Sequence, residues 1–183
     1  MGGWILLAIV AALAAWAVVA FNRLVRLRNQ MRSAWADIDV QLTRRHDLVP
    51  QLVKAVQAYA SHERAVLTAV TELRAEALRE TSPARLAEVE SALEKALARI
   101  FALQEAYPDL HASGNFLELQ RELVDVEEHL QYARRFYNGA VRDYNDAVQR
   151  VPDTLIARLF AFRGGEFFNA RDAERGAVQV QLS

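Results

Sequence analysis

Hydrophobic and polar residues alternate along most of the chain with the spacing of helices that pack against one another. The clearest stretch spans residues 31–59, where apolar side chains recur at alternating steps of four and three. Its members are Met31, Trp35, Ile38, Leu42, Val49, Leu52, Val56 and Tyr59. This spacing predicts an amphipathic helix of a helical bundle. Arg45 interrupts the apolar stripe, and Pro50 removes a helical hydrogen bond, which costs about 3 kcal/mol or more.

Two further helices are expected in the middle of the chain. Ser61 is predicted to cap a helix that ends near Glu80. A stronger boundary follows, since Ser82 is a cap residue and Pro83 suits the first helical position. The third helix is expected to stop before Pro108.

The longest soluble helix is expected after a loop over residues 108–114, with Asn115 as its cap, and it runs to about Arg150. Its stripe also holds two charges, Glu127 and Arg134. After Pro152 a short helix is predicted, and the tail from residue 169 is polar apart from a final VQVQL.

The charges in the two long stripes restrict how these helices can pair. If the first and last helices are antiparallel, one register sets Arg45 against Glu127 and places Arg134 beside Asp37 and Asp39. Shifting this register by seven residues in one direction sets Arg45 against Arg134, which carries a like charge. Shifting it in the other direction places Glu127 against the apolar Ile38. We therefore predict a structural charge network of these five residues, with a kink at the proline that follows.

An uninterrupted apolar segment, WILLAIVAALAAWAVVAF, spans residues 4–21. At 1.5 Å per residue this is about 27 Å of helix, enough to cross a bilayer. A cleaved signal peptide and a buried helix are the alternatives, but the charged n-region of a signal peptide is missing. We interpret the segment as a transmembrane anchor that continues into the next helix.

The flanks of this anchor predict its orientation. Only Met1, Gly2 and Gly3 precede the anchor, whereas four arginines follow it: Arg23, Arg26, Arg28 and Arg32. The positive-inside rule then places the body of the chain in the cytoplasm.

Composition excludes several kinds of chemistry. The chain has 183 residues, a formal net charge of -1 and no cysteine, which excludes disulfides, thiolate metal sites and cysteine nucleophiles. The near-neutral charge gives no general attraction for nucleic acid. The four histidines lack metal-ligand spacing and no nucleotide-binding or hydrolase motif occurs, so we expect no catalytic residue, cofactor or metal.

The antiparallel register returns the end of the last helix to the membrane side of the bundle. The segment LIARLFAFRGGEFF would then suit a bilayer surface, although its aromatic residues could equally cap the bundle. The possible membrane-interface residues are Arg23, Arg26, Arg28, Arg158, Phe160, Phe162, Arg163, Phe167 and Phe168.

Two smaller patterns leave alternatives open. Asp47 could bond Arg44 or face a partner. The pairs Tyr137-Asn138 and Tyr144-Asn145 repeat at seven residues, which predicts buried tyrosines, with asparagines that bond across to the first helix or, less simply, line a polar groove.

Several of these segments resemble the LemA family. They are AWADIDVQLTRRHDLVPQLV, the two Tyr-Asn pairs and the ending PDTLIARLFAFRGGEFF, and the likeness covers nearly the whole chain. Gln51 and Ala58 replace an asparagine and a glycine of the family pattern. The resemblance implies a membrane-anchored helical bundle of bacteria without an established enzymatic activity, associated with envelope stress and membrane-protein quality control. Some relatives look like lipoproteins with an exported bundle, but this chain has no lipobox cysteine.

The sequence thus predicts an all-α protein with an N-terminal transmembrane helix and an up-and-down four-helix bundle. We divide it into an anchor (1–22), a bundle (23–151), an aromatic-rich segment (152–168) and a tail (169–183). The expected function is a non-enzymatic scaffold or adaptor that contacts membrane lipids and other membrane proteins. A self-assembling, membrane-organising homo-oligomer is the alternative, and an enzyme is a more remote one.

Overall fold

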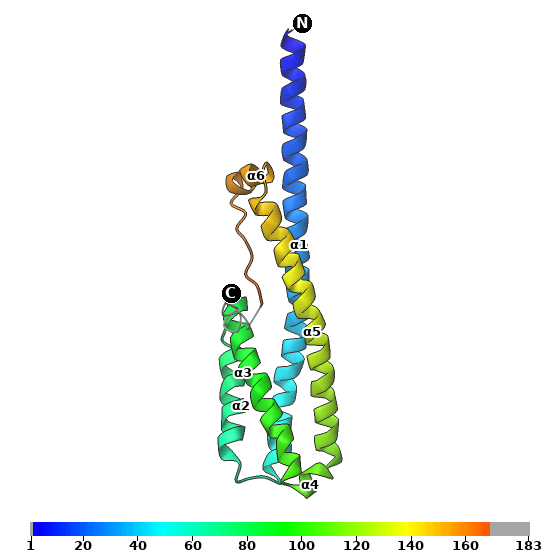
Figure 1. Ribbon diagram of the computed structural model, residues 1–183, viewed down its shortest axis with the longest axis vertical. Coiled ribbons are helices and arrows are strands. Elements are labelled where there is room, and N and C mark those ends of the chain that lie inside the picture. The colour runs from blue at the N-terminus through cyan, green and yellow to red at the C-terminus, as the bar shows by residue number, and fades with distance from the viewer. Residues whose placement is uncertain (1, 169–183) are drawn as a thin grey trace, which may run out of the picture. The chain divides into compact units, whose positions relative to one another are not determined.

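The fold is described for residues 2–168 of a computed structural model (Figure 1). The regular elements in this range are α1 (Gly2–Gln57), α2 (Arg64–Ala77), α3 (Pro83–Ala102), a 3-10 turn η1 (Leu103–Glu105), α4 (Pro108–His111), α5 (Gly114–Gln149) and α6 (Asp153–Leu159). The expected all-α fold with long first and last helices is confirmed. The predicted tail with its VQVQL segment lies outside the described residues.

The helix α1 continues from the apolar segment through Pro50 without a break. Among the described residues, α1 is the one helix that is long enough and apolar enough to cross a membrane. No glycine or proline interrupts it between the apolar segment and the amphipathic stripe, which explains the continuity. The expected continuation of the apolar segment into the amphipathic helix is therefore present.

The described chain forms two compact units, and both long helices contribute to each of them. Among the described residues, the first unit consists of residues 2–37 and 135–165, and the second of residues 38–134 and 166–168.

The second unit is a four-helix bundle made by the end of α1, α2, α3 and the start of α5 (Figure 1). Its core takes apolar side chains from all four helices. Fully buried members include Val49, Leu52, Val56, Val70, Leu93, Ile100, Phe116 and Val126. The predicted apolar stripes therefore face one another, as the spacing of four and three requires.

The first unit packs α6 and the residues after it against α1 and α5. Its core contains Ala20, Leu24, Tyr144, Ala147, Ile156, Ala157 and Phe162. Trp35 of α1 and Tyr137 of α5 meet edge to face, with ring centroids 5.1 Å apart. This aromatic pair belongs to the antiparallel register that the sequence predicts.

The helix boundaries correct part of the sequence-based expectations. The helix α2 ends at Ala77, three residues before the expected end near Glu80, and turn hydrogen bonds continue from there to Glu80. The Glu80 carboxylate accepts the backbone N–H groups of Thr81 and Ser82 at 2.8 and 3.0 Å. These two bonds lower the pKa of Glu80. The predicted cap of α3 is confirmed, since Ser82 Oγ accepts from the Arg85 N–H.

Two predicted caps are wrong. Ser61 lies three positions before the first residue of α2, and the N-cap position belongs to Glu63, whose carboxylate instead accepts from the Tyr107 hydroxyl at 3.0 Å. That hydrogen bond raises the pKa of Tyr107. Asn115 lies inside α5, where Ser113 Oγ accepts from the Phe116 N–H at 3.4 Å.

Candidate functional site

The most unusual feature of the second unit is an arginine in its core. Arg45 is only 2% exposed, and its guanidinium binds two carboxylates. Nη1 donates to Glu90 Oε2 at 2.9 Å, and Nη2 forms an ion pair with Glu127 Oε2. Glu90 comes from α3 and Glu127 from α5. The arginine in the stripe of α1 thus connects three helices of the bundle.

His46 extends this arrangement from the next position of α1. Its Nε2 lies 2.6 Å from Glu90 Oε1, and both side chains are buried. Burial raises the pKa of Glu90, but the His46 hydrogen bond and the Arg45 charge outweigh it, so the pKa is lowered overall. An ionised carboxylate only accepts hydrogen bonds, so His46 Nε2 is the donor.

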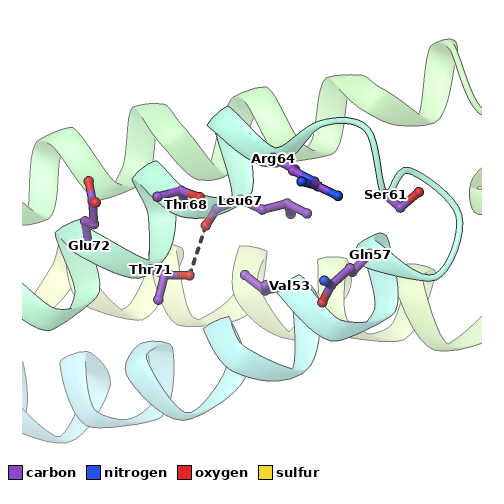
Figure 2. A pocket seen from close by; sticks show the side chains of 8 residues that line it. All are labelled: Val53, Gln57, Ser61, Arg64, Leu67, Thr68, Thr71 and Glu72. Atoms are coloured by element: carbon purple, nitrogen blue, oxygen red, sulfur yellow. Dashed lines mark hydrogen bonds between the residues drawn. The ribbon is translucent and has the colours of Figure 1, made fainter.

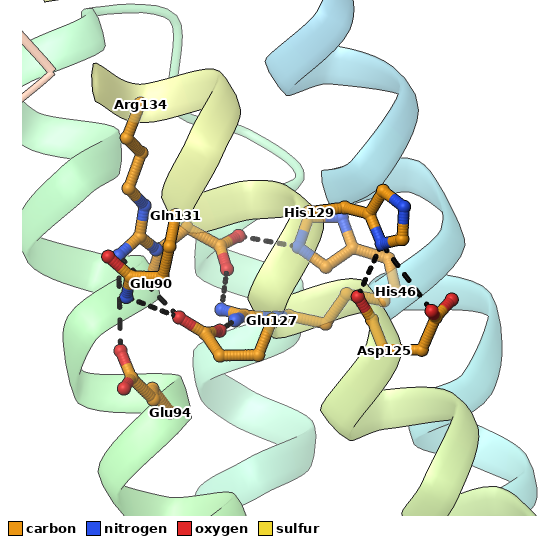
Figure 3. A network of polar contacts seen from close by, with 9 residues as sticks. His46, Glu90, Glu94, Asp125, Glu127, His129, Gln131 and Arg134 are labelled. Carbon is orange, nitrogen blue, oxygen red and sulfur yellow. Dashed lines mark hydrogen bonds and ion pairs between the residues drawn. The ribbon is translucent and has the colours of Figure 1, made fainter. Parts of the chain in front are cut away.

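Arg134 completes what we call the buried charge network, together with Arg45, His46, Glu90 and Glu127 (Figure 3). Its Nη1 lies 3.9 Å from Glu127 Oε1 and 4.0 Å from Glu94 Oε2. Two arginines therefore balance the two glutamates of the network. A balanced, hydrogen-bonded set of charges is the arrangement that a bundle interior tolerates.

Pro50 lies about one turn beyond the network and leaves a backbone carbonyl of α1 in need of another hydrogen-bond donor. Proline has no N–H, so the carbonyl of His46, four residues earlier, loses its helical donor. Arg74 Nε from α2 donates to that carbonyl oxygen at 2.6 Å. The neighbouring helix thus replaces the hydrogen bond that proline removes, which the sequence did not predict.

The structure brings together some of the predicted network residues and separates others. Arg45 lies against Glu127, as in the predicted register. Asp37 and Asp39, however, lie on the exposed side of α1, and Arg134 is paired with glutamates. The two aspartates are better placed in water, because an exposed carboxylate keeps its hydration without an ion pair.

Sequence reasoning missed two buried residues of the network, Glu90, which binds Arg45, and His46, which binds Glu90. Glu90 is fully buried and His46 is 6% exposed. A signal for Glu90 exists, since the third helix has a stripe with steps of four and three. Its members are Leu86, Glu90, Leu93, Leu97 and Ile100. The sequence therefore shows Glu90 as a charged residue within the apolar stripe of the third helix.

The possible membrane-interface residues of the first unit lie where α6 packs on α1. Arg23 Nη1 of α1 binds Asp153 Oδ2 at 3.2 Å, at the start of α6. Phe21 contacts the rings of both Phe160 and Phe162, at centroid distances of 4.8 and 5.6 Å. The residues after α6 therefore pack against the last turn of the apolar segment.

Burial divides these interface residues into two groups. Phe162 is buried, and the half-buried Arg28 places its guanidinium 4.8 Å from the centre of the Phe162 ring. Phe168 of the second unit is also buried, with Arg134 5.3 Å from its ring. The exposed members are Arg23, Arg26, Arg158, Phe160, Arg163 and Phe167. The sequence could not separate the buried residues from the exposed ones, because the aromatic residues of this segment alternate between the core and the outside.

The asparagine of the second Tyr-Asn pair has a structural role. Asn145 Nδ2 donates to the Gly165 carbonyl at 3.0 Å, and Asn145 Oδ1 accepts from the Gly165 N–H at 2.7 Å. A side chain on Gly165 would meet the end of the flexible Met31 side chain, which would have to move to make room. The tyrosines are buried as predicted, and burial raises the pKa of Tyr144. The asparagine thus holds the segment after α6 and not α1.

An open groove runs along α1 and α2 in the second unit (Figure 2). It is lined by Val53, Gln57, Ser61, Arg64, Leu67, Thr68, Thr71 and Glu72. The groove shares no residue with the buried charge network. Within residues 2–168, no three His, Asp or Glu side chains gather as a metal site.

Comparison with known proteins places the chain in a family. A family model described as LemA family matches residues 34–182, a range that includes the whole charge network. Among its relatives, Magnetosome protein MamQ 2 of Paramagnetospirillum magneticum is 22% identical and aligns with 90% of this chain and 70% of its own length. MamQ of Magnetospirillum gryphiswaldense is 21% identical, with coverages of 85% and 67%. Protein LemA of Metamycoplasma hominis is 25% identical, with coverages of 87% and 73%. Because the family match spans most of its length, this chain, a membrane-associated protein with an N-terminal apolar helix, belongs to the LemA family.

Proposed function

We propose that this protein is a non-enzymatic, single-pass membrane scaffold whose helical bundle contacts other envelope or membrane proteins. The observation that carries the proposal is the continuity of α1, which begins in the apolar segment and reaches the core of the bundle without a loop. A bundle attached in this way is joined to the apolar segment by one continuous helix and not by a loop. Such an attachment suits a protein that positions partners.

The pairing of the buried charges argues against a catalytic role. A general acid or base requires access to a substrate and a pKa matched to its task. Glu90 is fully buried, and its pKa is lowered by partners that hold it ionised. The groove along α1 and α2 contains none of the network residues. These charges therefore fit a structural role that fixes the register of the helices.

The arginines after the apolar segment favour a cytoplasmic bundle at the inner membrane. Arg23 and Arg26 are exposed, directly beyond the apolar segment. The positive-inside rule retains such clusters on the cytoplasmic side. The names of the relatives denote no reaction, and a scaffold in envelope stress or membrane-protein quality control agrees with the family resemblance.

Site-specific crosslinking in cells tests the scaffold proposal. A diazirine amino acid replaces Val40, which is 62% exposed on the bundle part of α1, and in a second variant Val18, which is 59% exposed in the apolar segment. We expect discrete protein adducts from Val40 and predominantly lipid adducts from Val18. Lipid adducts alone from both positions would contradict the scaffold.

Native mass spectrometry of the detergent-purified chain separates the scaffold from the alternatives. A monomer or small complex with a co-purified membrane protein is expected. A discrete large homo-oligomer would instead favour a membrane-organising assembly. A turnover screen that found an activity lost in Glu127→Gln, with the helical content unchanged, would overturn the non-enzymatic assignment.

A further inference from the structure

The helix α6 is apolar on both of its faces. Ile156 and Ala157 face the core of the first unit and are buried. On the outside, Leu155 is 60% and Leu159 is 75% exposed, and Val151, two residues before the helix, is 76% exposed. A helix in contact with water normally carries polar residues on its outer side. The outer side of α6 therefore suits a second apolar surface.

The position of α6 along α1 indicates which surface that is. Ile156, Ala157 and Phe162 share one cluster with Ala20 and Leu24, at the end of the apolar segment of α1. Phe160 is 55% exposed and contacts Phe21, the last residue of that segment. The exposed apolar side chains of α6 thus continue the exposed apolar surface of the membrane span.

The charges around α6 match the headgroup region of a bilayer. Arg150, Arg158 and Arg163 are exposed, whereas the acidic residue of α6, Asp153, is buried and paired with Arg23. The exposed side of this segment therefore carries positive charge next to apolar side chains. This combination is typical of helices that lie in the interface of an anionic membrane.

We propose that residues 151–160 form a membrane-interface collar, in which Val151, Leu155, Leu159 and Phe160 insert between anionic lipid headgroups beside the span. The ion pair of Arg23 with Asp153 and the contact of Phe21 with Phe160 fix the collar to α1. The collar goes beyond the scaffold function, because it concerns lipid and not protein partners. It would also set the depth and tilt of α1 in the bilayer.

Fluorescence quenching in proteoliposomes tests the collar in the full chain. The protein has no cysteine, so one cysteine at a time can carry an environment-sensitive label. The vesicles contain phosphatidylcholine and phosphatidylglycerol, with acyl chains brominated either near the headgroup or near the terminal methyl. Leu159→Cys reports on the collar and Val10→Cys on the middle of the span. Gln30→Cys is the water control, because nine residues of helix place it about 13 Å beyond Phe21.

For the label at Leu159 we expect blue-shifted emission and stronger quenching by the shallow bromines than by the deep ones. The label at Val10 should show the reverse depth order, and the label at Gln30 should be quenched by neither. Water-like emission at Leu159 with normal quenching at Val10 would overturn the collar and leave the anchor intact. Blue-shifted emission without quenching would also overturn it, since a protein or a second copy would then cover α6.

The lipid composition of the vesicles tests whether the collar prefers anionic headgroups. Omitting phosphatidylglycerol should weaken the quenching at Leu159 and leave that at Val10 unchanged. Arg158→Gln combined with Arg163→Gln should remove this lipid dependence without changing the helical content, because both arginines are exposed. Equal quenching in both lipids for the parent chain would contradict the anionic preference.

Discussion

The guanidinium of Arg45 and the carboxylate of Glu90 meet at 2.9 Å in a place that water does not reach. Both residues stand in apolar stripes, one in α1 and one in α3. A displaced register would separate them and leave two unpaired charges in the core. Breaking such a pair from one side costs about 3–5 kcal/mol, so the pair selects one arrangement of the helices.

Arg45→Met is expected to lower the free energy of unfolding by about 3–5 kcal/mol, because it leaves Glu90 buried without its cation. Chemical unfolding of the full chain in mild detergent, followed by circular dichroism, measures the loss. Arg44→Met is the matched control, since Arg44 forms an exposed ion pair with Asp125 at 2.8 Å. Exposed pairs contribute about 0–1 kcal/mol.

Double variants identify which carboxylate needs Arg45. Arg45→Met with Glu90→Met removes the fully buried charge and should recover most of the stability. Arg45→Met with Glu127→Met should recover less, because Glu127 is 25% exposed and also accepts from Gln131 at 2.7 Å. A larger recovery with Glu127→Met would reverse this order and make Glu127 the main partner.

Arg74 and Pro50 are predicted to be energetically coupled through the carbonyl of His46. Arg74→Met removes the donor at 2.6 Å, and an unsatisfied carbonyl costs about 1–3 kcal/mol. Pro50→Ala restores an N–H that can form the ordinary helical bond to the same oxygen. Arg74→Met should therefore cost much less in the Pro50→Ala background. A double-mutant cycle measures the coupling, and additive losses would show that Arg74 stabilises the bundle by other contacts.

The residue spacing predicted the parts of this fold that repeat along a single helix. Steps of four and three place Arg45 on the packed side of α1 and Glu127 on that of α5, and antiparallel pairing then restricts their register. The same reasoning holds for Trp35 and Tyr137. These relationships depend on two helices only, so periodicity was sufficient.

Other contacts depend on how a third element is placed, and these the sequence could not supply. Arg74 reaches the His46 carbonyl only because α2 packs beside the end of α1. Similarly, burial of Phe162 and exposure of Phe160 follow from the path of the chain after α6. No periodic pattern governs such a short irregular segment, so its aromatic residues could not be assigned to core or surface.

Stability is expected to fall in acid through Glu90. Its pKa lies below the ordinary value of 4.5 in the folded chain, so the unfolded chain binds more protons below that value. The stabilisation is complete above pH 4.5 and is lost as the pH falls through the lowered pKa of Glu90. Glu90→Gln should therefore flatten the acid limb of stability against pH, whereas Glu88→Gln, which removes an exposed carboxylate of the same helix, should not. Equal acid limbs in Glu90→Gln and the parent chain would contradict the assignment.

Asn145 is expected to control the order of the segment after α6. Asn145→Ala removes both hydrogen bonds to Gly165, and at about 0.5–1.5 kcal/mol each their loss should open the segment locally. Hydrogen exchange of the Gly165 amide should accelerate by more than tenfold. Asn138→Ala serves as the comparison, because it lies at the same position of the preceding Tyr-Asn pair. Unchanged exchange at Gly165 in Asn145→Ala would show that packing alone holds the segment.

The end of α6 offers a substitution that should stabilise the protein. Ala161 has a φ of 52°, the left-handed conformation that follows many helices. The Phe162 N–H donates to the Ala157 carbonyl at 2.9 Å and the Ala161 N–H to that of Arg158 at 3.3 Å, which together form a Schellman motif.

An L-residue with a side chain is disfavoured in this conformation by about 1–2 kcal/mol. Glycine avoids this cost, but its greater freedom in the unfolded chain cancels part of the gain. Ala161→Gly should therefore raise the free energy of unfolding by up to about 1 kcal/mol in thermal or chemical unfolding. Ala157→Gly, inside the same helix, should lower it by about 1 kcal/mol. A loss of stability in Ala161→Gly would show that the methyl group of Ala161 makes a contact worth more than the strain of its backbone.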